Sequence, residues 1–227
     1  MVKAKGKPAL DRSRVVGTAL RLLNEVGLDG LTLRRLAKEL NVQAPALYWH
    51  VRNKQELLDE MATAMLRDMS AGEGSAPGEA PPADTSWQEL LAETGRGLRR
   101  ALLRYRDGAK VFAGTRLTDT GHAAHQEAYL RRLVAAGFSP GAAARAFFIV
   151  FVFTEGFVIE QQAVEPMPGE RDPGYDVAQR SGSIGSEFPL AAQAGADLFR
   201  DYDARFEEGL AVVIAGVAAS LGPRTAP

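Results

Sequence analysis

The segment LTLRRLAKELNVQAPALYWH, residues 31–50, has the hydrophobic spacing of two short helices with a break between them. In the first half, apolar residues recur at i, i+3, i+4 and i+7, which predicts one buried helical face: Leu33, Leu36, Ala37 and Leu40. Thr32 is the expected N-cap of this helix. Pro45 suits the first turn of a second helix, because an N–H at that position would have no partner. Leu47 and Val51 then share the inner face of the second helix.

The outer side of the second predicted helix carries Tyr48, Trp49 and His50 in succession. Two short helices, a tight turn and an outer face of aromatic and polar residues are typical of a helix-turn-helix, whose second helix enters a DNA major groove. The alternative is a helical hairpin with partly exposed aromatic residues. Three such residues in a row are hard to bury on one side of a helix of under two turns, so the pattern favours DNA binding.

The remaining periodic segments are helical as well, and no strand pattern or internal repeat occurs. The expected helices cover residues 11–26, 54–70, 87–105, 109–113, 122–135, 141–163, 190–199 and 203–221. Gly27 is the expected stop of the first of these helices, and Asn53 the cap of the second. We therefore expect an all-α fold with an N-terminal head of three or four helices and a larger C-terminal helical body.

Composition marks the expected domain boundaries. Residues 1–10 form a basic arm without hydrophobic period, which we expect to be disordered, and residues 11–70 contain the helix-turn-helix domain. The segment AGEGSAPGEAPPADTS, residues 71–86, is a linker too poor in large apolar residues to pack. Residues 87–227 form the body, in which residues 164–187 lack periodicity. A loop of that length is usually functional or disordered.

Two helices of the body are expected to form a dimer interface. The helix at 141–163 contains FFIVFVF and is apolar nearly all round, so it must be buried on several sides. The helix at 203–221 carries small residues that permit close approach of another helix: Gly209, Ala211, Ala215 and Gly216. Because a helix-turn-helix usually reads two half-sites about 34–36 Å apart, we expect a homodimer on double-stranded DNA.

The net charge of −1 is distributed unevenly. Residues 1–54 carry eleven Lys and Arg against four Asp and Glu, a balance of +7, which leaves −8 for the rest of the chain. If the charged residues only kept the surface solvated, no such segregation of charge would be expected. Contact of one end of the molecule with DNA phosphates would explain it. The overall 46% hydrophobic and 24% charged residues are ordinary for a soluble globular protein.

Several classes of protein are disfavoured. The chain has no cysteine, which excludes disulfides, Cys-ligated zinc and iron–sulfur clusters. No N-terminal signal pattern occurs, and the longest apolar run, residues 147–153, is too short to span a bilayer. We therefore expect a cytoplasmic protein without a membrane partner.

Two pairs of residues suggest other chemistry. His122 and His125, at i and i+3, could form a metal pair, but no third ligand lies nearby in sequence, which favours a solvated or hydrogen-bonded role. Glu155 and Glu160 could suggest an acid–base pair, yet five positions apart on a helix they point to different sides. An enzyme remains the alternative from another class. A third alternative is an activator or a non-specific DNA-binding protein. Strong discrimination between a palindromic site and random DNA would separate a repressor from this alternative.

The segment LNEVGLDGLTLRRLAKELNVQAPALYWHVRNKQELLDEM, residues 23–61, resembles the DNA-binding domain of the tetracycline repressor (TetR) family. RRALLRYRDGAKVFAGTR (residues 99–116), FTEGFVIEQQ (residues 153–162) and the last two helices are similar to the tetracycline repressor's own ligand-binding domain, which most of the family does not share. The resemblance covers nearly the whole chain except the arm, the linker and the long loop. It implies a homodimeric repressor that leaves its operator when a small molecule binds the body, often controlling an efflux or resistance gene.

The resemblance assigns DNA contacts to the outer face of the helix-turn-helix and its flanks. The positions concerned are Arg34, Gln43, Ala44, Pro45, Ala46, Tyr48, Trp49, His50 and Lys54. Ala44 stands where the tetracycline repressor has a base-reading Gln, and Ala46 where it has a Thr. A Gln amide can pair with a base edge through both of its ends, which Ala cannot do. We therefore expect an operator that differs from the tetracycline operator.

The resemblance also places an effector site in the body. Thr115, Arg116 and Glu160 match residues that hold the drug's magnesium ion and its water shell, or that lie in the loop that moves on induction. The His that binds the metal directly is Phe112 here. Three polar residues that bind the drug's oxygenated edge in the tetracycline repressor are also replaced. Thr94 stands for an Asn, Ser70 for a His and Ala128 for a Gln.

The remaining expected lining of the effector site is apolar: Leu98, Phe151 and Phe157. These substitutions favour a flat, more apolar effector, such as an aromatic polyketide, with no cofactor. Magnesium could accompany the ligand but is disfavoured by Phe112, because one carboxylate and water hold this ion weakly. A repressor that responds to magnesium–tetracycline stays open as the alternative.

Overall fold

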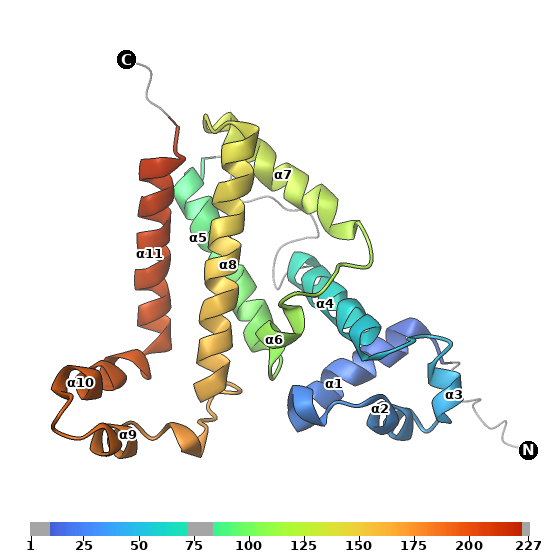
Figure 1. Cartoon of the computed structure of the whole chain (residues 1–227). Coiled ribbons are helices and arrows are strands. Elements are labelled where there is room, and N and C mark those ends of the chain that lie inside the picture. The colour runs from blue at the N-terminus through green and yellow to red at the C-terminus, as the bar shows by residue number, and fades with distance from the viewer. Residues whose placement is uncertain (1–9, 72–83, 224–227) are drawn as a thin grey trace, which may run out of the picture.

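The computed structural model describes residues 10–71 and 84–223, and every regular element in this part is helical (Figure 1). The expected all-α fold is therefore confirmed. The elements are α1 (Arg12–Gly30), α2 (Leu33–Leu40), α3 (Ala44–Leu47), α4 (Lys54–Ala71), α5 (Trp87–Leu103), α6 (Gly108–Phe112), α7 (Gly121–Ala135), α8 (Pro140–Val164), the 3-10 helix η1 (Pro173–Tyr175), α9 (Val177–Ile184), α10 (Pro189–Leu198) and α11 (Tyr202–Ser220). The basic arm up to residue 9 and residues 72–83 of the linker lie outside the described residues.

Local capping residues delimit the helices of the head. The Thr32 side chain accepts a hydrogen bond from the Arg35 N–H and begins α2, as the sequence predicts. Asn41 ends α2 in the left-handed conformation, with φ of 54°. Gly27, the expected stop of the first helix, has φ of 68° and interrupts α1 three residues before its end. Asn53 caps α4 by accepting the Glu56 N–H at 2.8 Å.

α4 belongs to both halves of the molecule, because one hydrophobic core extends through it from the head into the body. Its Leu57 and Met61 are fully buried in the same cluster as Leu23 of α1, Leu102 of α5 and Val158 of α8. The helix also packs against α1, α5, α6 and α7. The helix-turn-helix head is therefore attached to the body through a shared core.

The body is built on three long helices, α5, α8 and α11, which lie side by side with α7 crossing near one end (Figure 1). A second core cluster joins them through the fully buried residues Leu91, Leu133, Val150, Phe206 and Leu210. Small residues on α8, such as Ala143 and Ala146, allow its neighbours to approach closely.

α8 is buried on the sides that face α5, α6, α7 and α11, as its apolar sequence predicts, but one side is exposed. That side carries Phe148, Ile149 and Val152, and Val212 of α11 is exposed as well. By length and composition alone, α8 is also the one helix of the described part that could cross a membrane. Its contacts with α5, α7 and α11 are those of a core helix.

The segment 164–187, which lacks hydrophobic period, contains two short helices, η1 and α9. Asp172 caps η1 by accepting the Gly174 N–H, and Asp176 caps α9 by accepting the Gln179 N–H. α9 packs mainly on α10, and the two helices lie on the side of the body away from the head (Figure 1). Polar caps therefore order a segment whose apolar pattern is too weak to predict helices.

Candidate DNA-binding face and effector site

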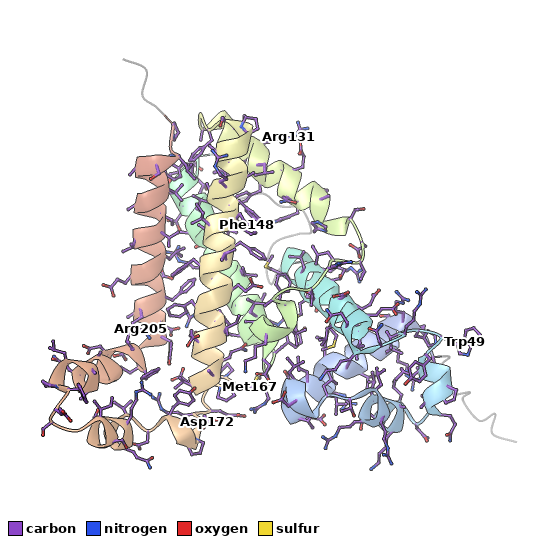
Figure 2. The ribbon with its side chains drawn as sticks, viewed as in Figure 1. Trp49, Arg131, Phe148, Met167, Asp172 and Arg205 are labelled. Atoms are coloured by element: carbon purple, nitrogen blue, oxygen red, sulfur yellow. The ribbon has the colours of Figure 1, made fainter. Side chains whose placement is uncertain are left out.

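The outer face of the helix-turn-helix is exposed, as the sequence predicts. Leu47 and Val51 are buried under α3, whereas Tyr48 is more than half exposed and Trp49 is 87% exposed (Figure 2). The other residues assigned to DNA also reach the surface: Arg34, Gln43, Ala44, Pro45 and Lys54 are exposed, and Ala46 and His50 are partly exposed. The Trp49 indole therefore lies on the surface at the basic end of the chain and does not contribute to the core.

The first turn of α4 fixes the geometry beside this face. The Glu56 carboxylate accepts the Arg52 N–H at 2.8 Å, and Arg12 of α1 forms ion pairs with Glu56 and Glu60. The Lys54 ammonium donates to the Leu28 carbonyl at 2.9 Å and stays exposed. These contacts hold the end of the recognition segment against α1 and α4, so its orientation depends on both helices.

In the body, four aromatic rings form a continuous chain from α6 across α8 to α7. Phe112 lies 5.7 Å from Phe151, Phe151 lies 6.2 Å from Phe147, and Phe147 lies 5.2 Å from Tyr129, between ring centroids. We call these four residues the aromatic wall. Leu98 of α5 is buried in the same core cluster as Phe112. The wall therefore brings together Phe112 and Phe151 of the predicted effector site, and Leu98 lies in the same core cluster.

Polar groups lie at the Tyr129 end of the aromatic wall. The Tyr129 hydroxyl donates to the Leu90 carbonyl at 3.2 Å, and the Thr94 hydroxyl donates to the same carbonyl at 2.9 Å. Burial raises the pKa of Tyr129 well above its ordinary value. His122 lies two turns before Tyr129 on the same face of α7, and its Nδ1 atom is buried without a hydrogen-bond partner among the described residues. The wall is thus apolar in the middle and polar at one end.

Tyr129 was not among the predicted site residues, and the prediction for its neighbour Ala128 is wrong. Ala128 is exposed on the outer surface of α7, whereas Tyr129 is buried. The rotation of α7 decides this, because adjacent helical residues point about 100° apart. In the sequence, the apolar spacing of Tyr129 and Leu133, at i and i+4, indicates that these two residues share the buried face of α7. The side chain of Ser70 lies outside the described residues.

Two predicted effector residues lie elsewhere on α8. Phe157 packs against Phe153, Phe206 and Tyr202 in the contact with α11, on another side of α8 from Phe151. Glu160 is exposed, and in the described part of the chain it makes no ion pair with Arg116. Six residues separate Phe151 from Phe157, which corresponds to roughly 240° around a helix. Neither residue therefore joins Phe112 within one subunit.

The loop after α6 is hydrogen-bonded to α4. The Thr115 hydroxyl donates to the Phe112 carbonyl at 2.7 Å, which ties the loop to the aromatic wall. The Arg116 N–H donates to Asp59 of α4 at 3.1 Å, and the Thr118 N–H donates to the buried Thr63 hydroxyl at 2.9 Å. Thr115 and Arg116 thus lie between the wall and the helix that begins at the DNA-binding face.

The histidine pair of α7 has no metal-binding geometry to support it. His125 is exposed while His122 is partly exposed, and the described residues contain no group of three or more His, Asp or Glu that could hold a metal ion. Glu155 and Glu160 point to different sides of α8, as expected from their spacing. Burial raises the pKa of Glu155. These residues form no catalytic constellation with each other.

A basic helix-turn-helix head joined through a shared core to an all-helical body defines a DNA-binding transcriptional regulator. Two family models match the chain: "Bacterial regulatory proteins, tetR family" over residues 15–61, and "Tetracyclin repressor-like, C-terminal domain" over residues 80–221. The chain therefore belongs to the TetR family of transcriptional regulators, whose members are not enzymes.

Known proteins similar to this chain include tetracycline repressors and regulators from Streptomyces. The tetracycline repressor protein class A from transposon 1721 of Escherichia coli is 43% identical over 209 residues, which cover 92% of this chain and 91% of that protein. The structure of a possible TetR family transcriptional regulator from Streptomyces coelicolor A3(2) is 40% identical, with a TM-score of 0.76 and coverage of 92% of this chain and 99% of that one.

Among the similar solved structures that contain ligands are the following two. One is the Streptomyces coelicolor protein ActR in complex with (S)-DNPA, 30% identical with a TM-score of 0.73, covering 94% of this chain and all of that one. The other is TetR(class A) in complex with 5a,6-anhydrotetracycline and magnesium, 38% identical with a TM-score of 0.64, covering 92% of this chain and 99% of that one.

Proposed function

We propose that this protein is a cytoplasmic, homodimeric repressor that binds a palindromic operator and leaves it when a flat aromatic effector binds the body. The regulated gene encodes an efflux or resistance function. The observation that carries this proposal is the aromatic wall from Phe112 to Tyr129, connected to α4 through the loop at Thr115 and Arg116. The rings of the wall would stack on a flat polycyclic ligand, and the loop contacts extend from the wall toward the DNA-binding head.

The exposed apolar side of α8 and α11 supports the homodimer. Phe148, Ile149 and Val152 follow one side of α8, and Val212 lies on α11, where four apolar side chains would otherwise contact water. A second copy related by a two-fold axis would cover this surface with the same surface of its own. It would also supply the second head that a palindromic operator requires. Glu160 is exposed on α8 as well.

Contacts between the body and the head support release of DNA by an effector. Besides the loop after α6, the corner between α5 and α6 contacts α1: Asp107 accepts the Leu28 N–H at 2.9 Å, and the Arg106 N–H donates to Asn24 at 2.8 Å. A ligand that moves α6 would change these contacts together with those to α4. Release follows if the effector binds better to the arrangement that does not fit the operator.

The residues of the aromatic wall do not fit a magnesium ion. Magnesium prefers oxygen ligands in octahedral geometry, and Phe112 offers a hydrocarbon ring where the resemblance expects a metal-binding His. The Thr115 hydroxyl donates its hydrogen to the Phe112 carbonyl, and Glu160 lies on another side of α8. An apolar ring system would instead gain contact with Phe112, at roughly 25 cal/mol per Å² of apolar surface buried. The effector is therefore a polycyclic aromatic compound that needs no metal.

Titration of a fluorescently labelled operator complex tests the effector class. We expect emodin, a flat hydroxylated anthraquinone, to release the DNA equally with and without EDTA, and magnesium–tetracycline to release little. Phe112→His should raise the response to magnesium–tetracycline, whereas the matched variant Phe112→Leu should not. Efficient, EDTA-sensitive release of the parent protein by tetracycline would refute the metal-free effector and establish the alternative, a magnesium–tetracycline repressor.

A further inference from the structure

A second potential binding region lies away from the aromatic wall, where α5, α8 and α11 meet the segment after α8. It is a cleft of about 640 Å³, within the range of about 300–1,000 Å³ that is typical of small-molecule sites. None of the four wall residues lines it. Its lining consists of Arg99, Leu103, Gln161, Glu165, Met167, Pro168, Gly169, Asp201, Tyr202, Asp203 and Ala204. In Figure 2, Met167 lies just beyond the end of α8 and Arg205 lies in the first turn of α11, next to the last of these residues.

Arg99 is the fixed cation of this cleft. Its Nε and Nη2 atoms donate to the Gln161 Oε1 atom at 3.1 and 2.9 Å, and its guanidinium lies 4.9 Å from the centroid of the Phe206 ring. Its side chain is 12% exposed, whereas its ion-pair partner Asp203, at 2.7 Å, is 94% exposed. A fully exposed carboxylate gains little from such a pair, so Asp203 is easily displaced. The Nη1 atom of Arg99 has no partner in the described part of the chain.

Gln161 supplies an oriented donor. The residue is only 7% exposed, and its Oε1 atom is identified by the two hydrogen bonds that it accepts from Arg99. Its Nε2 amide group therefore carries two hydrogens that have no acceptor among the described residues, although the residue lines the cleft. This amide group is not fully enclosed, so solvent reaches it through the cleft, and a ligand oxygen would take the place of that solvent. Arg99 and Gln161 thus present neighbouring donors to the same space.

The charges around the cleft balance in pairs. Glu165 lies 3.4 Å from Arg171, and Asp201 lies 3.8 Å from Arg200, while Asp203 pairs with Arg99. The N-terminus of α11 also faces the cleft, and its cap Asp201 forms no capping hydrogen bond, so the first N–H groups of the helix favour an anion. Three nearby carboxylates make a doubly charged anion unfavourable. A singly charged carboxylate fits this environment.

We propose that this cleft binds a small molecule that combines one carboxylate with an apolar body. The ligand carboxylate accepts hydrogen bonds from Arg99 Nη1 and Gln161 Nε2 and takes the place of Asp203 beside the guanidinium. Planar carboxylates suit the fork of an arginine, which explains the preference over a point-like anion. Leu103, Met167 and Tyr202 contact the apolar body. The site is independent of the proposed effector site at the aromatic wall.

Two isosteric variants give opposite expectations. Gln161→Glu keeps the shape and the contact with Arg99 but replaces the amide donor by a negative charge. It should weaken binding of the probe 2-naphthoate at least about tenfold, because a charge-assisted hydrogen bond is lost and a repulsion is added. Asp203→Asn removes the competing carboxylate and should strengthen 2-naphthoate binding by roughly threefold or more.

Isothermal titration of the full-length protein measures these affinities, with 2-naphthylmethanol as the neutral probe and 2-naphthylmethylamine as the cationic one. We expect the neutral probe to bind weakly and to respond to neither variant. The cleft would instead be a cation site if the amine bound more tightly than the naphthoate and Asp203→Asn weakened it. Unchanged 2-naphthoate affinity in both variants would also refute the proposed carboxylate site. If emodin still releases operator DNA from the Gln161→Glu variant, the proposed repressor function stands whatever the outcome at this cleft.

Discussion

Gly209 and Gly216 lie two turns apart on α11, and the structure places them in opposite surroundings. A Cβ atom at Gly209 would lie 2.7 Å from Cζ and 3.0 Å from Cε2 of Phe153, whereas a Cβ at Gly216 would meet nothing within 4 Å among the described residues of its own subunit. From the sequence, both glycines are expected at the dimer interface. The structure assigns Gly209 to the contact between α8 and α11 within one chain.

The same substitution should therefore have opposite effects at the two positions. In a helix interior, Gly→Ala stabilises by roughly 0.5–1 kcal/mol, because it reduces the freedom of the unfolded chain. At Gly209 the added methyl group collides with a ring that stacks on Phe206 at 5.8 Å and packs against Phe157 at 6.0 Å. Overpacking of this kind costs about 1–3 kcal/mol. We expect Gly216→Ala to be more stable than Gly209→Ala by roughly 1–3 kcal/mol.

Urea unfolding of both variants at one protein concentration measures the difference, since the stability of a dimer depends on the concentration of its protomers. The slope with urea should stay unchanged, so that the midpoints report stability directly. Phe153→Leu should remove the collision, and the double variant with Gly209→Ala should show a favourable coupling between the two changes. Equal midpoints for the two alanine variants would refute the reasoning about Phe153.

Three further predictions concern DNA binding, assembly and pH. Trp49→Ala should weaken operator binding while changing the free energy of unfolding by no more than about 0.5 kcal/mol, because the indole is exposed. Lys54→Ala should reduce the slope of log affinity against log salt concentration by about one unit. Fluorescence anisotropy at several salt concentrations checks both variants, and an unchanged affinity of Trp49→Ala would exclude the indole from the interface. Ala44→Gln combined with Ala46→Thr should shift preference toward the tetracycline operator in the same assay. Val212→Glu should convert the dimer to a monomer in sedimentation, and a dimer that persists would place the interface elsewhere. Burial raises the pKa of Glu155 above its unfolded value, so the stability that this residue contributes is present at low pH and is lost as pH rises through the folded pKa. Glu155→Gln should therefore raise the melting temperature at pH 7 but not at pH 3. The same change in melting temperature at both pH values would contradict this prediction.

The sequence by itself determines the local architecture of this protein. Thr32, Asn53 and Ser139 cap the helices that follow them because short polar side chains satisfy free N–H groups at a helix start, an interaction within a few residues. Gly27, the predicted stop of the first helix, and Gly137, which follows the end of α7, have positive φ for the same local reason. The helix-turn-helix follows from its hydrophobic spacing, since the inner face of each helix depends only on the helical period.

Tertiary structure alone decides which neighbour each helical face meets. The period of α8 places Phe151 and Phe157 on different sides, but the surrounding helices determine that one joins Phe112 and the other joins Phe206. Tyr129 likewise enters the aromatic wall through the rotation of α7.

The cleft at Arg99 contains side chains that are more than sixty positions apart in the sequence, such as Arg99 and Gln161. One hydrophobic core extends through α4 into both the head and the body, although the linker composition assigns these parts to separate domains. Local sequence carries no signal for such contacts, because they depend on how whole helices rotate and pack to bury the largest apolar surface at once.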